Sequence, residues 1–321
     1  MAHVGFGLAL KNFTPHPEMP DFQEVRAYAV RAEQLGFDSL WAWDHVLLGS
    51  AKPFPFLESL ATLAGIAAVT ERVELGTGIL VLPLRNPVVL AKVTASLDAM
   101  SGGRLTLGVA SGWYQREFEA VGVPFHERGR IMERNLDVLQ RFWVEDAVTG
   151  QADGMVFRNA VMLPKPARRP RPGLLIGGYV DKVLRRAATK GDGWLTYFYT
   201  AGGFARSWSK VRAFAEEAGR DPGTVRNVAQ LPICVDDSYE KADRRAREFV
   251  DRFFDCPPWS ESTPDSAIRG TPDQCAEQLA AHIDAGVQHV CLVPWEYGLE
   301  QLDAIATDVL PKLQPAATEP R

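Results

Sequence analysis

Asp44 and His45 are neighbouring residues whose side chains suit proton transfer. They follow the apolar run FDSLWAW, residues 37–43, which is typical of a buried strand. A histidine can donate or accept a proton near neutral pH, and a carboxylate beside it can orient its ring or contact a polar ring edge of a ligand. A histidine in such a place can also be purely structural. The elements around the pair must therefore decide between these two interpretations.

Glycine near the ends of several apolar runs is the second chemical signal. A strand interior normally excludes glycine, because glycine packs no side chain and loses the most conformational freedom on folding. Such glycines mark either a strand end with a bulge or a place where a ligand approaches the backbone. Glycines that precede a helix also expose N–H groups that suit a phosphate, unless they only form a tight turn. These glycines, with the small polar residues beside them, are Gly76, Thr77, Gly78, Gly108, Ser111, Gly112, Gly177 and Gly178.

Short apolar runs alternate with amphipathic stretches along the whole chain, and this pattern predicts eight strand–helix units. The expected strands are 4–10, 37–43, 72–82, 104–110, 173–178, 193–198, 225–236 and 287–294. Eight parallel strands joined by helices predict an α/β fold of the (β/α)8 or TIM barrel type, with residues 1–321 as a single domain. An open doubly wound sheet is the alternative, but no G-x-G-x-x-G follows any expected strand.

The carboxyl ends of the strands carry the active site of such a barrel, so the Asp44–His45 pair and the glycine ends should share one face. Three neighbouring strands ending in glycine suggest a common ligand that lies against bare backbone. Either Trp41 or Trp43 should face inward, because side chains alternate along a strand. Two insertions interrupt the pattern, at 111–128 on the active-site face and at 147–171, which belongs to the opposite face or forms an extra hairpin. Further tryptophans that suit an aromatic pocket wall are Trp113 and Trp194.

Composition limits the classes of function. The net charge of -5 argues against nucleic acid or an anionic membrane as a partner. Walker A, H-E-x-x-H and G-x-S-x-G motifs are absent from the sequence. The cysteines show no C-x-x-C pair and no histidine spaced for zinc, so we expect reduced thiols, no metal site and a cytoplasmic protein without a targeting segment. These cysteines are Cys234, Cys256, Cys275 and Cys291.

Five stretches together resemble the luciferase-like monooxygenase superfamily, in the expected order and over nearly the whole chain. They are GFDSLWAWDHV, TERVELGTGILVLPLRNPVVLAK, MSGGRLTLGVASGW, LLIGGYVDKVLRRAATKGDGW and GTPDQCAEQLAAHIDAGVQHV. Within the superfamily the chain most resembles the flavin and deazaflavin oxidoreductases of the coenzyme F420 group. The resemblance implies a modified (β/α)8 barrel, a homodimer, a small-molecule substrate and either F420 or FMN as cofactor.

The resemblance also implies roles for individual residues. A non-prolyl cis peptide between Gly78 and Ile79, preceded by Thr77, would support the central ring of the flavin or deazaflavin. Asp44 and His45 would lie near the reactive ring as the catalytic residues. The remaining implied contacts are Gly108, Ser111 and Gly112 beside the ribityl chain, and Gly177 and Gly178 at the phosphate.

Two positions depart from the pattern of F420-dependent sugar-phosphate dehydrogenases. Trp113 stands where those enzymes have a carboxylate, directly after the glycine that Gly112 matches. Gly49 stands where they have a tryptophan, four positions after the active-site histidine. These departures argue against a sugar phosphate and favour a less polar substrate.

Three functions remain open on the sequence. The first is an oxidoreductase that transfers hydride between C5 of F420 and an organic substrate, with His45 donating or accepting the proton. The second is a monooxygenase that uses reduced FMN and oxygen. The third is a non-catalytic barrel that binds a flavin or no cofactor, as a sensor or partner protein. No residue separates the first two, because both cofactors would share one ring and phosphate site.

Overall fold

The computed structural model describes residues 4–49, 52–254 and 263–313. Within them, eight parallel strands close into a barrel, because β8 pairs with β9 and β11 pairs with β1. These strands are β1 (Gly5–Ala9), β2 (Ser39–Ala42), β3 (Glu74–Val81), β4 (Leu105–Ala110), β7 (Gly173–Gly177), β8 (Gly193–Tyr197), β9 (Arg226–Val235) and β11 (His289–Pro294). The eight expected strands and the barrel are thereby confirmed.

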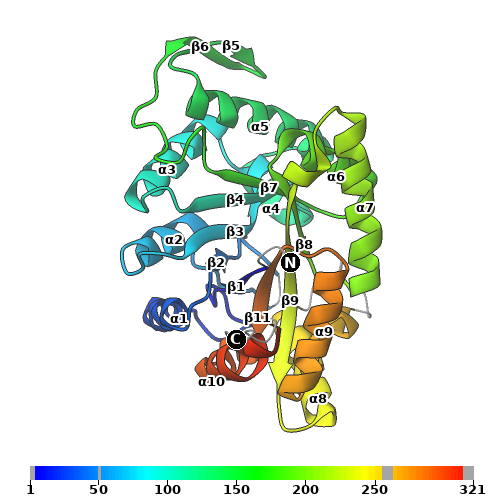
Figure 1. The fold of residues 1–321 in the computed structure, drawn as a ribbon. Coiled ribbons are helices and arrows are strands. Elements are labelled where there is room, and N and C mark those ends of the chain that lie inside the picture. The colour runs from blue at the N-terminus through cyan, green and yellow to red at the C-terminus, as the bar shows by residue number, and fades with distance from the viewer. Residues whose placement is uncertain (1–3, 50–51, 255–262, 314–321) are drawn as a thin grey trace, which may run out of the picture.

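The main helices form a ring outside the strands (Figure 1). They are α1 (Phe22–Gln34), α2 (Ser59–Ala67), α3 (Pro87–Met100), α5 (Arg128–Val144), α6 (Asp181–Lys190), α7 (Ala201–Glu217), α8 (Tyr239–Phe253), α9 (Pro272–Asp284) and α10 (Leu299–Ala304). Local sequence determines where several of them begin. Asn86 caps α3 by accepting hydrogen bonds from two backbone N–H groups, and Thr271 forms a capping box with Gln274 at the start of α9.

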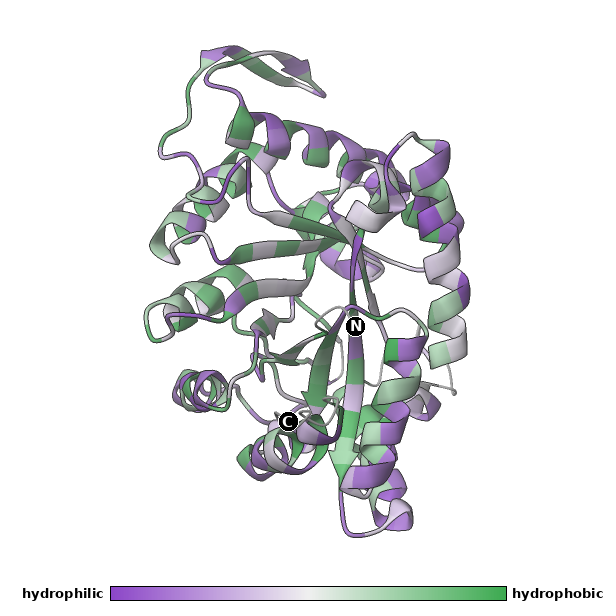
Figure 2. Cartoon of the chain, viewed as in Figure 1, coloured by the Kyte–Doolittle hydropathy of each residue, from purple (hydrophilic) through white to green (hydrophobic). Residues whose placement is uncertain are grey.

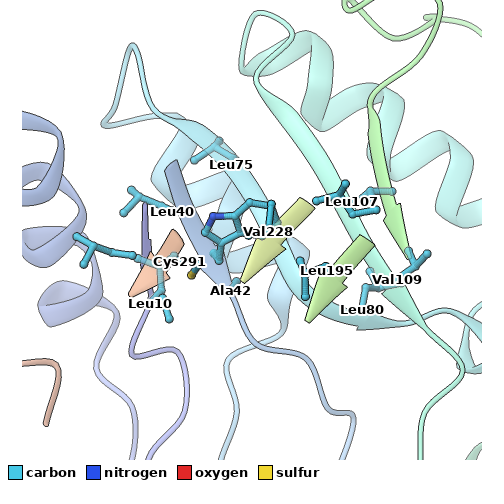
Figure 3. Packing of buried hydrophobic residues seen from close by; sticks show 14 of the residues in the cluster. Leu10, Leu40, Ala42, Leu75, Leu80, Leu107, Val109, Leu195, Val228 and Cys291 are labelled. Carbon is cyan, nitrogen blue, oxygen red and sulfur yellow. The ribbon is translucent and has the colours of Figure 1, made fainter. Parts of the chain in front are cut away.

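The core fills both the barrel interior and the space between the strands and the helix ring. Leu107 of β4, Leu195 of β8 and Cys291 of β11 are fully buried together, although they come from distant parts of the chain (Figure 3). Figure 2 shows mostly hydrophobic barrel strands, whereas the outer helices alternate hydrophobic and hydrophilic residues. Parallel strands covered by helices are buried on both faces, which explains why the expected strands read as apolar runs.

Both insertions form structure of their own. The first contains α4 (Gln115–Val121), which follows β4. The second forms an antiparallel hairpin of β5 (Val148–Ala152) and β6 (Met155–Ala160) that stands outside the helix ring beyond α5 (Figure 1). The sequence missed the strand β10 (Ile268–Gly270), which pairs with β9, because three residues are too few for a visible period. In the part of the chain that the structure describes, no helix has the length and apolarity needed to span a bilayer.

Candidate active site

A bulge in β3 forms the floor of the site. The pairing of β3 with β4 shifts between Thr77 and Leu80, so that Gly78 and Ile79 lie opposite the single residue Gly108. The peptide bond between Gly78 and Ile79 is cis, as the resemblance implies. The Thr77 hydroxyl donates a hydrogen bond to the Gly108 carbonyl at 2.8 Å. We refer to Gly78 and Ile79 as the β3 bulge.

The glycines around the β3 bulge are required by the protein itself. A Cβ on Gly177 would lie 2.1 Å from Cδ1 of Ile79, and a Cβ on Gly108 would lie 2.3 Å from the Thr77 carbonyl oxygen. Real side chains do not make such contacts, so these glycines leave room for the displaced backbone and for the Ile79 side chain. Neighbouring protein atoms thus fill the side-chain positions of Gly108 and Gly177, and the approach of a ligand to the glycine backbone stays a prediction. Gly78 and Gly177 still line the cavity, but through backbone that the bulge has shaped.

Gln230 of β9 holds the β3 bulge from inside the barrel. Its Nε2 donates a hydrogen bond to the Gly78 carbonyl at 3.3 Å, and both groups are buried. A Cβ on Gly78 would lie 2.1 Å from the same Nε2. Glycine at position 78 is thus what allows the amide to approach. Gln230 is not among the site residues predicted from the sequence, although a glutamine inside an apolar strand is a visible signal.

A cavity of about 340 Å³ opens at the carboxyl ends of the strands. The β3 bulge and the loop from Gly177 to Val180 line one part of it, together with Ser111 and Gly112. His45 and a group of aromatic rings line the other part. These rings, which we call the aromatic chamber, belong to Phe13, Trp43, Phe56, Trp113, Phe253 and Phe254. The structure therefore brings most of the expected site residues to one cavity.

His45 is held by Glu117, which is not among the site residues predicted from the sequence. The Nδ1 atom of His45 lies 3.1 Å from Oε1 of Glu117, and the carboxylate also accepts the backbone N–H of Val46 at 2.9 Å. Glu117 is fully buried on α4, in the first insertion. An ionised carboxylate only accepts hydrogen bonds, so Nδ1 of His45 is the donor and Nε2 is the nitrogen left for proton exchange.

The Asp44 carboxylate is hydrogen-bonded to residues other than His45. Its carboxylate accepts hydrogen bonds from the Ser59 hydroxyl, the Val81 backbone N–H and the Arg85 guanidinium, at 2.9, 2.9 and 2.7 Å. Burial alone would lower the pKa of Arg85, but Asp44 and Glu58 outweigh it and raise that pKa. Asp44 lines the cavity and ties the end of β2 to the end of β3. The expectation that Asp44 orients His45 is corrected, because among the described residues Glu117 does so.

The tryptophans divide between cavity and core. Trp113 and Phe56 pack against the His45 ring, with centroids 5.7 and 5.4 Å away. Trp43 lines the cavity, whereas Trp41 is buried against Gly76 inside the barrel. Trp194 is also buried and donates its Nε1–H to the Gly178 carbonyl at 2.9 Å. Trp194 therefore positions the loop after β7 and does not form the pocket wall that the sequence suggested.

The loop after β7 leads directly into α6. Gly178 has φ of +137°, a conformation that favours glycine, and α6 begins at Asp181. The first N–H groups of a helix lack partners within the helix and attract an anion. Asp181 in this first turn is paired with Lys210 at 2.8 Å, so its charge is offset. This end of the cavity can therefore receive a phosphate.

Comparisons with known proteins agree with this fold. The family model described as luciferase-like monooxygenase matches residues 4–289. An F420-dependent glucose-6-phosphate dehydrogenase of Amycolatopsis mediterranei is 27% identical over 346 residues, covering 98% of this chain and 99% of the relative. A solved F420-dependent secondary alcohol dehydrogenase with an F420-acetone adduct superposes with a TM-score of 0.82 at 20% identity, covering 98% of this chain and 100% of that one. A monooxygenase from Streptomyces bottropensis gives a TM-score of 0.83 at 22% identity, covering 97% and 100% of the two chains. The chain belongs to the luciferase-like monooxygenase family.

Proposed function

We propose that this protein is an oxidoreductase that binds coenzyme F420 and transfers hydride to or from a small organic substrate. One observation carries the proposal: the β3 bulge and His45, whose ring is held from behind by Glu117, line the same cavity. A flat ring resting on the bulge would have its reactive edge beside the proton-exchanging atom of His45. The relative from Amycolatopsis mediterranei, named as F420-dependent and aligned over almost the full length of both chains, supports this choice.

The residues of the cavity fit such a cofactor. The β3 bulge, with Thr77 before it, would support the ring. Ser111 and Gly112 would lie along the ribityl chain, with Gly108 beneath the bulge. Gly177, Gly178 and the first N–H groups of α6 would hold the phosphate. When bound, F420 would donate or accept the hydride, and the barrel would supply position and electrostatics.

His45 would donate or accept the proton that accompanies the hydride. Glu117 keeps Nδ1 as a donor, so Nε2 would give a proton to the substrate oxygen on reduction or take it on oxidation. Asp44 would act as a positioning residue, because its bonds to Ser59, Val81 and Arg85 hold the wall on which His45 stands. The rings of Phe56 and Trp113 shield His45 from water.

Titration of the purified protein with F420 and, separately, with FMN tests the proposal. Fluorescence quenching should show F420 binding in the micromolar range, with FMN bound at least about tenfold more weakly. Tighter binding of FMN, with oxygen consumption when reduced FMN is added, would favour the monooxygenase. Absence of binding for both cofactors would refute a redox function and favour a non-catalytic barrel.

We further propose a cytoplasmic homodimer. Val89 on α3 and Val156, Val161 and Leu163 in and after the β5–β6 hairpin are more than half exposed, and such apolar surface is typical of an interface. Cys234, Cys275 and Cys291 are buried thiols without disulfides, which suits a reducing compartment. Light scattering after size exclusion should give twice the mass of one chain, and a mass of one chain would contradict the dimer.

A further inference from the structure

The aromatic chamber is a preformed apolar space beside His45. Phe13 stacks on Phe56 with centroids 4.8 Å apart, and its ring edge meets Trp43 at 5.8 Å. Trp43 in turn packs against Phe254 at 5.3 Å. Because each ring is fixed by another ring, the chamber keeps its shape without a ligand. A rigid apolar wall binds by excluding water and offers few hydrogen bonds to a sugar.

The charged side chains around the chamber already have partners of their own. The acidic side chains beside it, Asp44 and Glu117, are bound to Arg85 and His45. The lining contains no lysine or arginine among the residues that the structure describes. Arg85 contacts Asp44 and Glu58 beside the chamber, and the Arg252 guanidinium lies over the ring of Phe253.

Arg252, next to Phe253 in the chain, is likewise paired with Glu18 and Glu296. A phosphate that entered the chamber would thus meet buried carboxylates and no unpaired cation among the described residues. Burying a charge without a partner is strongly unfavourable. An ammonium group would find both nearby carboxylates already hydrogen-bonded, so the faces of the rings would be its main contacts.

We infer that the aromatic chamber takes an uncharged, largely apolar substrate whose single carbonyl or hydroxyl group lies at Nε2 of His45. This inference rests on the proposed function and adds the substrate class. Aryl and alkyl ketones and the matching secondary alcohols have this chemistry. Phosphorylated sugars and quaternary amines do not, so the substrate differs in class from glucose 6-phosphate.

Calorimetric titration of the protein, with and without F420, tests the inference using three probes. These are acetophenone as the neutral ketone, glucose 6-phosphate as the anion and benzyltrimethylammonium as the aromatic cation. We expect acetophenone to bind at least about tenfold more tightly than either charged probe. Equal or tighter binding of glucose 6-phosphate or of the ammonium would overturn the inference.

A matched pair of variants locates the binding. Phe56 and Phe214 are both partly buried, but Phe56 lies in the chamber and Phe214 lies on α7 beneath the Arg185 guanidinium. Phe56→Leu should weaken acetophenone binding about fivefold, because one ring of the wall is lost. Phe214→Leu should leave it unchanged. Equal effects of the two substitutions would place the ketone elsewhere and contradict the inference.

The two proposals fail in different ways. If F420 binds but glucose 6-phosphate is preferred to acetophenone, the substrate class is wrong and the cofactor proposal stands. If acetophenone binds selectively but F420 does not, the chamber is as inferred and the cofactor proposal is wrong. The circular dichroism spectrum of each variant, compared with that of the unchanged protein, confirms that a loss of binding is not a loss of folding.

Discussion

The side-chain amide of Gln230 donates a hydrogen bond to the carbonyl of Gly78 at 3.3 Å, across the interior of the barrel and over 152 residues of sequence. This bond joins β9 to the β3 bulge, and it forms only when the barrel is closed. The absence of a side chain at Gly78 is what lets the amide approach so closely. Barrel closure and the shape of the cofactor floor are thus coupled through two residues.

Gln230→Leu should weaken this coupling. We expect the free energy of unfolding to fall by about 1–2 kcal/mol, because the buried Gly78 carbonyl loses its donor. We also expect F420 to bind more weakly, as seen by fluorescence titration. The control is Gln301→Leu, which removes a buried amide that bonds both backbone groups of Val235 away from the cavity. The control should lose stability but keep F420 affinity, and equal losses of affinity would argue against a role for Gln230 in the cavity.

Glu117→Gln should impair turnover more than binding. The neutral amide holds the His45 ring less firmly as an Nε2 proton donor, so kcat should fall roughly tenfold to a hundredfold. The dissociation constant for F420 should stay within about twofold, because Glu117 does not line the cavity. Glu119→Gln, on the exposed side of the same helix and bonded to Gln115, is the matched control and should change neither value. A parallel loss of F420 affinity in Glu117→Gln would indicate a structural role only.

His45→Asn should lower kcat by about a hundredfold or more if His45 exchanges the proton. His45 and Glu117 act together through their hydrogen bond. The double variant His45→Asn with Glu117→Gln should therefore have a kcat little lower than that of His45→Asn alone. Steady-state kinetics of the four proteins provide the double-mutant cycle. Additive losses would show that Glu117 acts independently of His45.

Gly177→Ala should disturb the β3 bulge through Ile79. The new Cβ would lie 2.1 Å from Cδ1 of Ile79 and 3.2 Å from the Leu195 carbonyl oxygen. We expect a loss of about 1–3 kcal/mol in stability, measured by urea unfolding. Ile79→Val removes the clashing atom and should restore part of the loss. Gly129→Ala, on α5 with open space around the new Cβ, should not destabilise the protein, and a similar loss there would rule out the proposed clash.

Asp192→Asn should show a pH-dependent loss of stability. Burial would raise the pKa of Asp192, but Arg171 and the backbone N–H of Leu174 outweigh it and lower that pKa. A carboxyl whose pKa is lower in the folded state stabilises that state above its unfolded pKa, and the contribution is lost as pH falls through the folded pKa. We expect the variant to lose about 1–2 kcal/mol near neutral pH and less as the pH falls from about 5 toward 3. Asp181→Asn, which breaks an exposed pair with Lys210, should have little effect at any pH.

Urea unfolding of the Asp192→Asn variant and the unchanged protein at several pH values measures this difference. A gap in stability that stays constant down to pH 3 would contradict the assignment of the stabilisation to the ionised carboxylate.

Sequence patterns identified the barrel strands because a strand that is buried on both faces appears in the sequence as a continuous apolar run. The run at 104–110 is apolar since β4 is covered by helix on one side and by the barrel interior on the other. The same pattern located the second insertion but left open whether it forms a hairpin, and the structure shows that it does. The three-residue strand β10 is too short to form such an apolar run, and its pairing depends on the neighbouring strand β9.

The pattern of apolar and polar residues along the sequence was enough to determine that this chain forms eight strand–helix units and that His45 lies at the mouth of the barrel. Only the tertiary structure decided which carboxylate serves His45: Asp44 is adjacent in sequence but turns to Arg85, whereas Glu117 reaches the ring from an insertion. It also decided that Gln230 lies under Gly78 and that the glycines make room for Ile79. The physical reason is that burial periodicity is encoded by neighbouring residues, while hydrogen-bond partners are selected by barrel closure, which brings distant strands together.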